Sequence, residues 1–240
     1  KVEEIAADQP EVYAELALFY AARGRAADSV RVWNRLSDQD KAAYPNITKV
    51  MAQGLFDKRF FEQSLEFARQ VGIDSESEPN TVTNPGFESA LTNADETFFG
   101  WRLAKNEGKL DIAPDSSVKH SGARSLRFGF RNYAKAELYN VFQTVVVKPN
   151  KSYRLKFWLR TEGLKSAGNP QLEIVNANDD KLMVSTKPFP IGTNDWQEIE
   201  ISFTTPENCT GMTIRTSRSF CGDGCPIAGT IWYDDFSLTN

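Results

Sequence analysis

The sequence has few of the side chains on which many metal sites and enzymes depend. Its 240 residues include one histidine, His120, and three cysteines. A structural zinc site needs about four Cys or His ligands at suitable spacing. His120 lies far along the chain from Cys209, the first of the cysteines. We therefore expect no zinc site and no histidine-based catalytic centre.

The chain also has no excess of positive charge and no long apolar runs. The chain has 28 Lys and Arg residues against 32 Asp and Glu residues, which gives a net charge of −4. This balance does not supply the basic field that binding to a phosphate backbone requires, so we expect no nucleic-acid partner. No stretch approaches the roughly 18 apolar residues of a membrane span. The hydrophobic fraction, 40%, is enough for one large or two modest folded domains.

Apolar residues recur with a helical period in the first 71 residues. The pattern predicts two helical hairpins, formed by the segments 10–23, 26–36, 47–56 and 60–71. The following segment 72–84, GIDSESEPNTVTN, is acidic, rich in serine and interrupted by proline, and is typical of a short linker. We therefore place a helical segment at 1–74. Because Lys1 opens the chain within a helical pattern, we expect this segment to be truncated from a longer array.

The helical segment resembles the tetratricopeptide repeat. Two copies of its pattern are visible: Tyr13, Leu16, Ala17, Tyr20, Gly24, Ser29 and Trp33, then Thr48, Met51, Ala52, Leu55, Arg59, Ser64 and Ala68. Arg59 departs from the family, which has a turn glycine at that place. About three such repeats are needed to bury a continuous core, so further repeats upstream or docking of the last helix on the next domain is expected. The resemblance implies a protein partner for the helical repeats.

From about residue 80 the pattern changes to short strands with aromatic and β-branched residues. The expected strands are 123–130, 138–147, 153–160, 172–175, 181–185, 197–203, 212–216 and 230–238. Turn residues separate them, and no helical pattern intervenes. This arrangement is typical of an antiparallel β-sandwich, and its length suits a jelly roll. The fold class is therefore α+β in separate domains, with a β-sandwich at 80–240.

Six motifs in this half resemble the galactose-binding-like jelly roll of carbohydrate-binding modules, of the family 4/9/22 type. In order they are NPGFES at 84–89, FGW at 99–101, HSGARSLRF at 120–128, the Q-x-V-x-V and Y-x-L-x-F hairpin at 143–157, Trp196 with TTP at 204–206, and WYDDFSL at 232–238. The resemblance implies binding of an oligo- or polysaccharide. The fold also hosts protein binders and purely structural domains.

The same resemblance implies a structural calcium ion. Its ligands would be Glu88 of the opening motif and Asp234 of the closing motif, with backbone carbonyls near His120 completing the shell. Calcium accepts such oxygen ligands in flexible geometry. The alternative is that Glu88 and Asp234 are hydrogen-bonded turn carboxylates without a metal. Period-two alternation places Asp234 on the same strand face as Phe236.

One strand carries an unusual mixture of side chains on its outward face. In 153–160 the outward residues are Arg154, Lys156, Trp158 and Arg160. An aromatic ring among hydrogen-bonding side chains is a common way to hold a sugar ring. We expect the strand 138–147 to neighbour this one and to bring Phe142 near Trp158, with Arg215 also outward. Alternatively, Trp158 is covered by the helical repeats, a partner protein or a loop, or the face is an uneventful solvated surface.

The cysteines indicate the cellular compartment in which the protein would be stable. Cys221 and Cys225 flank two glycines in CGDGC, which would let them close a small disulfide loop. Such a clip would indicate a periplasmic or extracellular protein. Reduced, partly buried thiols are the alternative, since three cysteines leave one unpaired under any pairing.

Catalysis is the weaker hypothesis. The paired carboxylates fall in an apparent turn, in the closing motif or on an alternating strand, and no G-x-S-x-G or phosphate-binding glycine loop is present. We therefore predict a non-enzymatic carbohydrate-binding or scaffolding protein of a bacterial cell envelope or exopolysaccharide system. The alternative is a protein–protein assembly module whose jelly roll does not bind sugar.

Overall fold

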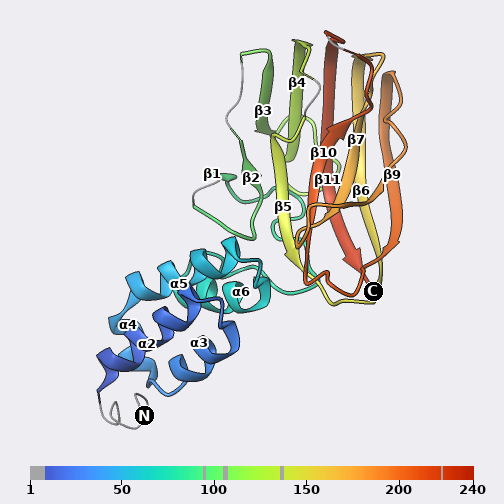
Figure 1. Cartoon of the computed structure of the whole chain (residues 1–240). Coiled ribbons are helices and arrows are strands. Elements are labelled where there is room, and N and C mark those ends of the chain that lie inside the picture. Colours follow the sequence, from blue (N-terminus) through green and yellow to red (C-terminus); the bar gives the residue numbers. More distant parts are fainter. Residues whose placement is uncertain (1–8, 94–95, 105–107, 136–137, 223) are drawn as a thin grey trace. The chain divides into compact units, whose positions relative to one another are not determined.

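The computed structural model describes residues 9–93, 96–104, 108–135, 138–222 and 224–240 (Figure 1). The chain forms two compact units, Lys1–Ser77 and Glu78–Asn240. We call them the helical unit and the β-unit. Within the described part of the chain, no helix combines the length and apolar character that crossing a membrane requires.

The helical unit contains α2 (Pro10–Ala22), α3 (Ala26–Trp33), α4 (Asp38–Ala43), α5 (Pro45–Asp57) and α6 (Phe61–Gln70). Proline stands in the first turn of α2 and of α5, where a missing backbone N–H costs nothing. The short α4 was not expected from the periodicity. Its N-cap is Ser37, whose hydroxyl accepts a hydrogen bond from the backbone N–H of Asp40.

The two hairpins, α2–α3 and α5–α6, repeat the same local contacts. Ser29 donates a hydrogen bond to the carbonyl of Ala17, and Ser64 donates one to the carbonyl of Ala52, each at 2.8 Å. The turn of the first hairpin has Gly24 at φ 71°, and the second has Arg59 at φ 66°, so arginine there accepts a backbone conformation that favours glycine. The two predicted hairpins are present. Their assignment as tetratricopeptide repeats stays a prediction.

The β-unit is a sandwich of two sheets, as predicted. The six-stranded sheet has the order β1-β2-β5-β10-β7-β8, and the five-stranded sheet has the order β3-β4-β11-β6-β9. All pairs are antiparallel except the short pair β1–β2. The strands are β1 (Thr92–Asn93), β2 (Arg102–Leu103), β3 (Leu110–Asp115), β4 (Ser125–Tyr133), β5 (Val141–Val146), β6 (Ser152–Lys165), β7 (Pro170–Asn176), β8 (Leu182–Ser185), β9 (Gly192–Thr204), β10 (Gly211–Arg218) and β11 (Ile227–Thr239).

Eight of these strands coincide with expected segments, and β1, β2 and β3 were not expected. The first two have two residues each, too few for a visible alternation. The third contains Pro114, which argues against a central strand, and β3 is indeed an edge strand.

An aromatic cluster joins the beginning of the β-unit to its end. Phe236 of β11 stacks on Phe157 of β6, with ring centroids 5.0 Å apart. It also contacts Phe87 and Trp101 of the opening segment, with centroid distances of 5.9 and 5.1 Å. The backbone N–H of Phe236 donates to the carbonyl of Pro85 at 3.0 Å. All four aromatic residues are buried, so they form the central part of the core.

A β-bulge in β11 interrupts the alternation of side chains that was expected for this strand. The register with β6 shifts between Asp234 and Ser237, and Asp235 has a φ of 47°. Asp234 is paired with Trp158, a residue of the outward row, whereas Phe236 lies in the core. The two therefore do not share a strand face, because the bulge interrupts the period of two.

Candidate functional site

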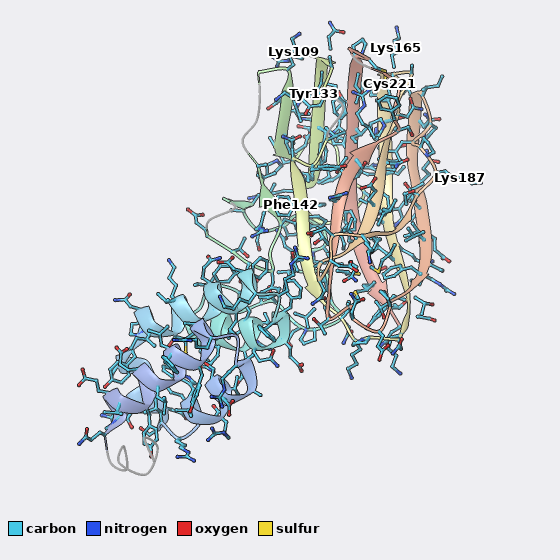
Figure 2. All side chains as sticks on the ribbon, viewed as in Figure 1. Lys109, Tyr133, Phe142, Lys165, Lys187 and Cys221 are labelled. Carbon is cyan, nitrogen blue, oxygen red and sulfur yellow. A yellow bond between two sulfur atoms is a disulfide. The ribbon has the colours of Figure 1, made fainter. Side chains whose placement is uncertain are left out.

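A row of side chains crosses the outer face of the six-stranded sheet. Strand register places Arg102, Phe142, Arg215, Glu173 and Ser185 opposite one another on β2, β5, β10, β7 and β8. Directly opposed residues project to the same side of a sheet. Their neighbours along the strands point into the core, as the burial of Val141 and Ile214 shows. We call these five residues the outer row (Phe142 is labelled in Figure 2).

Two arginines of the outer row lie on aromatic rings. The Arg102 guanidinium carbon is 4.6 Å from the centroid of Phe142. The Arg215 guanidinium carbon is 3.9 Å from the centroid of Tyr139, which precedes β5 and is 39% exposed. Each ring is thus combined with a cation, so apolar and polar groups lie next to each other on this face.

Glu173 anchors this arrangement from within the sheet. Its Oε2 accepts a hydrogen bond from Arg215 Nε at 2.9 Å and lies 2.8 Å from Arg215 Nη2 in the same ion pair. Its Oε1 accepts a hydrogen bond from the hydroxyl of Ser217 at 2.7 Å. Glu173 is buried, and these bonds fix the position of the Arg215 guanidinium.

The outer face of the five-stranded sheet is different, because its cations are paired with exposed acids. The predicted outward row of β6 is confirmed: the side chains between its members are buried core residues. Lys156 pairs with Glu198 at 2.9 Å and with Glu200 at 3.3 Å, and hydrogen bonds to these two carboxylates raise the pKa of Lys156. Arg154 pairs with Glu200, and Arg160 pairs with Asp195.

Trp158 lies under the only histidine of the chain. The His120 and Trp158 rings are stacked, with centroids 3.8 Å apart and an interplanar angle of 14°. His120 also meets the edge of Trp196, at 5.8 Å. Its Nδ1 lies 2.6 Å from Asp235 Oδ2. A residue of the loop between β3 and β4 therefore covers one face of the Trp158 ring, in line with the alternative that a loop covers Trp158, although the sequence did not single out His120 for this contact.

The predicted ligand-binding residues fall into two separate groups. Phe142 and Arg215 belong to the six-stranded sheet, whereas Trp158 and the three cations of its row belong to the five-stranded sheet. The expectation that Phe142 lies near Trp158 is wrong, because β5 pairs with β2 and β10, and β6 pairs with β11 and β9. The two aromatic residues project from opposite faces of the sandwich.

The acidic residues of the two end motifs do converge. Asp234 Oδ2 accepts hydrogen bonds from the backbone N–H groups of His120 at 2.8 Å and Ser121 at 3.3 Å. Glu88 accepts from the backbone N–H of Ala123 through both oxygens, at 2.9 and 3.0 Å. Burial raises the pKa of Asp234, and the charge of Asp235 adds to this effect, while the backbone N–H groups oppose it.

A family model for a carbohydrate binding domain, CBM_4_9, matches residues 79–217, more than half of the chain. The chain belongs to this family. The match lies within the β-unit and includes every residue of the outer row, and we call the β-unit the carbohydrate-binding domain.

Curated relatives of the chain are distant. The tRNA nuclease WapA of Bacillus subtilis strain 168 is 25% identical over 177 residues, which is 70% of this chain and 7% of that protein. The tRNA3(Ser)-specific nuclease WapA of Bacillus spizizenii is 27% identical over 146 residues, which is 58% of this chain and 6% of that protein. The chain therefore spans less than a tenth of these relatives, whose names describe the whole proteins.

Solved structures similar to this chain include several carbohydrate-binding modules. TmCBM61, solved in complex with β-1,4-galactotriose, has 22% identity and a TM-score of 0.42, covering 68% of this chain and 99% of its own. A CBM4 structure has 14% identity and a TM-score of 0.48, covering 66% and 98%. The CBM22-1 xylan-binding domain of Xyn10C from Paenibacillus barcinonensis has 13% identity and a TM-score of 0.42, covering 64% and 89%.

The donor groups around Gly86 of the carbohydrate-binding domain are those that calcium prefers. A Cβ atom placed on Gly86 would lie 3.5 Å from an oxygen of Asp234 and of Asp235, and 3.7 Å from Cγ of Glu88. These carboxylates thus surround a position that has no side chain. In the described ranges, no group of three or more His, Cys, Asp or Glu side chains is arranged to hold a metal. The donor chemistry fits calcium if backbone carbonyls complete the shell, and calcium stays a prediction.

His120 was a predicted contributor to that metal site. The structure gives its backbone N–H to Asp234 and its ring to Trp158 and Asp235. The turn that follows requires glycine, because a Cβ atom on Gly122, at φ 57°, would collide with the Glu88 carboxylate. His120 therefore contacts Asp234 through its backbone N–H and Asp235 through its ring.

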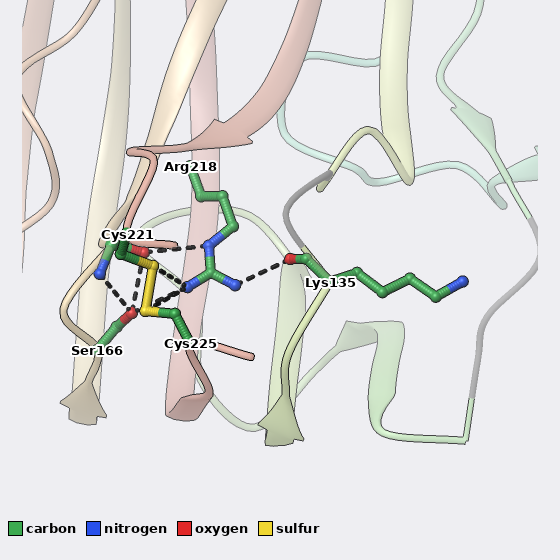
Figure 3. The surroundings of a disulfide bond; sticks show 6 residues. Lys135, Ser166, Arg218, Cys221 and Cys225 are labelled. Carbon is green, nitrogen blue, oxygen red and sulfur yellow. Dashed lines mark hydrogen bonds between the residues drawn. A yellow bond between two sulfur atoms is a disulfide. The ribbon is translucent and has the colours of Figure 1, made fainter. Parts of the chain in front are cut away.

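The carbohydrate-binding domain contains the predicted disulfide, between Cys221 and Cys225 (Figure 3). Cys209 is a buried free thiol. Burial raises the pKa of Cys209 to about 11, so this thiol is protonated and unreactive near neutral pH.

Beside the disulfide lies Arg218, which is buried (Figure 3). Its guanidinium donates to the carbonyls of Lys135 at 2.9 Å and Gly168 at 3.3 Å. It also donates to the Ser166 hydroxyl and to both disulfide sulfur atoms. Arg218 thus connects three loops at one end of the domain, including the loop that leads to Tyr139.

Proposed function

We propose that this chain is a non-catalytic glycan-binding protein, and that the glycan lies across the outer row of the six-stranded sheet. The observation that carries the proposal is the row itself, in a domain of a carbohydrate-binding family. It combines the aromatic ring of Phe142 with the guanidinium of Arg215, and the ring of Tyr139 lies beside that guanidinium. Sugars present an apolar ring face and hydroxyl groups, which such a surface can contact together.

The five-stranded face supports the proposal less well. The Trp158 ring has His120 stacked on one side, and the cations of its row are engaged with Glu198, Glu200 and Asp195. A sugar would have to displace His120 to stack on that side of the ring. The sequence-based choice of Trp158 as the platform is therefore replaced by Phe142 as the proposed platform.

The cellular setting and the helical unit are part of the same proposal. A disulfide persists in oxidising compartments, which supports a periplasmic or extracellular location in a cell-envelope or exopolysaccharide system. We propose that the helical hairpins contact a protein partner while the β-unit contacts glycan. An assembly module without sugar binding is the alternative, and binding measurements distinguish the two.

Replacement of Phe142 by alanine is expected to weaken glycan binding at least tenfold, which corresponds to about 1.4 kcal/mol. The matched Trp158→Ala variant is expected to retain the parent affinity, because Trp158 lies on the other sheet. A glycan array identifies a ligand for the parent chain, and titration calorimetry compares the variants after thermal melting has confirmed their folding. Loss of binding in Trp158→Ala alone would move the site to the five-stranded sheet, and a parent chain that binds no glycan would contradict the proposal.

We further propose that calcium binds beside Gly86, with Glu88 and Asp234 as ligands. A cation there would stabilise the buried carboxylate of Asp234 in its charged form. At free calcium near 100 times its Kd, we expect Tm to rise by about 5–10 °C. Scanning calorimetry with calcium and with chelator measures this shift. Asp234→Asn should lose it and Asp195→Asn, an 85%-exposed position, should keep it; identical curves for the parent chain would refute calcium binding.

A further inference from the structure

We infer that the Cys221–Cys225 disulfide is a thiol-exchange site, at which a dithiol reductant opens the bond and the Arg218 guanidinium stabilises the thiolate that is released. The inference goes beyond the proposed function and does not depend on glycan binding. Three observations carry it: the partners of the buried Arg218, the position of the two sulfur atoms, and the short length of the loop that the bond closes.

Arg218 is a buried cation with neutral partners. It is 6% exposed, and its guanidinium donates to two backbone carbonyls, to the Ser166 hydroxyl and to the two sulfur atoms. In the part of the chain that the structure describes, no carboxylate is among these partners. Burial lowers the pKa of Arg218, and the titratable group that opposes this shift is Tyr133. A buried charge without a counter-charge is unfavourable, so an anion at this position would be strongly stabilised.

The two sulfur atoms are the groups that can supply this anion. Nη2 of Arg218 lies 3.2 Å from Cys221 Sγ and 3.4 Å from Cys225 Sγ (Figure 3). A disulfide sulfur is a weak acceptor, whereas a thiolate forms a strong, charge-assisted hydrogen bond with a guanidinium. Arg218 therefore stabilises the reduced form more than the disulfide, and it makes the sulfur beside it a better leaving group.

The place of the bond in the chain also favours exchange. It joins residues four positions apart, and the stabilisation that a cross-link gives to a fold grows with the length of the loop that it closes. Opening the bond therefore sacrifices little of the stability of the domain. Cys221 is partly exposed and follows Phe220, which is 84% exposed, whereas Cys225 is 9% exposed. We therefore expect an external thiol to reach Cys221 first.

The exchange takes place in two steps. A thiolate of the dithiol attacks Cys221 Sγ, the S–S bond breaks, and its electron pair goes to Cys225 Sγ, which remains a thiolate beside Arg218. The second thiol of the reductant then attacks the mixed disulfide and releases Cys221 as a thiol. The chain gains two electrons and the dithiol becomes a disulfide. Of the two protons that the dithiol loses, one ends on Cys221 and the other goes to solvent.

Equilibration of the folded full chain with mixtures of reduced and oxidised dithiothreitol tests the inference, with mass spectrometry to count the alkylated cysteines. We expect Arg218→Met to shift the equilibrium at least tenfold toward the disulfide, which corresponds to about 30 mV. Arg154→Met, at a 57%-exposed position of the other sheet, should leave it unchanged. An arginine that only held the loops together would give the opposite sign, because its loss would expose the bond to the reductant. Easier or unchanged reduction of Arg218→Met would therefore overturn the inference.

A second measurement keeps the inference falsifiable if Arg218→Met does not fold. It follows the pH dependence of alkylation of the reduced parent chain by iodoacetamide, with glutathione measured in parallel. We expect Cys225 to reach half of its maximal rate at a clearly lower pH than glutathione, because the guanidinium stabilises its thiolate. Arg218→Lys retains the charge and should keep part of this shift. A profile of Cys225 in the parent chain at or above that of glutathione would overturn the inference.

Discussion

Phe236→Ala is expected to destabilise the β-unit by about 3–5 kcal/mol, the range for removal of a buried phenylalanine side chain. Phe236 is 3% exposed, stacks on Phe157 at 5.0 Å and contacts Phe87 and Trp101 of the opening segment. Its loss would leave a cavity where the first and last segments of the unit meet. Urea unfolding followed by tryptophan fluorescence measures the change, since four of the five tryptophans lie in the β-unit.

Phe220→Ala is the matched control for this experiment. Phe220 is 84% exposed, so the same chemical change should alter the free energy of unfolding by less than about 0.5 kcal/mol. A Phe236→Ala variant as stable as the Phe220→Ala variant would show that the opening and closing segments are not packed as described.

Arg218→Ala is expected to destabilise the β-unit by about 3 kcal/mol, because hydrogen bonds to a charged group contribute about 1.5–3 kcal/mol each. The substitution leaves the carbonyls of Lys135 and Gly168 without their donor. Burial lowers the pKa of Arg218, because the buried guanidinium has lost part of its hydration. Removing this charge therefore offsets part of the stability that is lost with the hydrogen bonds. Urea unfolding under non-reducing conditions measures the effect with the disulfide intact.

Arg218→Met separates hydrogen bonding from packing, since methionine fills much of the same volume without a donor. We expect Met to be destabilising but less so than Ala, while Arg154→Ala, at a 57%-exposed position, should be nearly neutral. Parent-like stability of both Arg218 variants would mean that the guanidinium does not hold the three loops together.

Alternation along single strands was the most predictable property of this molecule. The inward row of β6, with Tyr153 and Leu155, and that of β5, with Val141 and Val145, are buried as the sequence indicates. The reason is local: successive side chains of a strand point to opposite sides, and one side must be apolar. The exception, Asp234, lies next to a bulge, which alternation cannot reveal.

The assignment of strands to sheets was not predictable in the same way. The segment between β5 and β6 is short, and it favours an antiparallel neighbour pair. In the structure it crosses from one sheet to the other, and the Thr205 hydroxyl, 54 positions beyond Lys151, donates to the carbonyls of Lys148 and Lys151. The alternation pattern gives the faces of a strand but not its partner, so Phe142 and Trp158 were placed together wrongly.

Long-range pairs explain the remaining differences at the candidate site. His120 and Trp158 are separated by 38 positions, and Arg215 and Glu173 by 42, so no local spacing signals either contact. Arg215 was recognised as outward, but its partner was not. The disulfide, by contrast, joins residues four positions apart and was visible as a possibility from CGDGC.

The hydrogen bond from Phe236 to Pro85 has a consequence for how such a unit can be accommodated within larger proteins. It joins the opening segment of the β-unit, at Pro85, to its last strand, at Phe236, so the two end segments of the unit lie side by side. Such a unit could therefore be inserted into an exposed loop of a host protein without increasing the distance between the two ends of that loop.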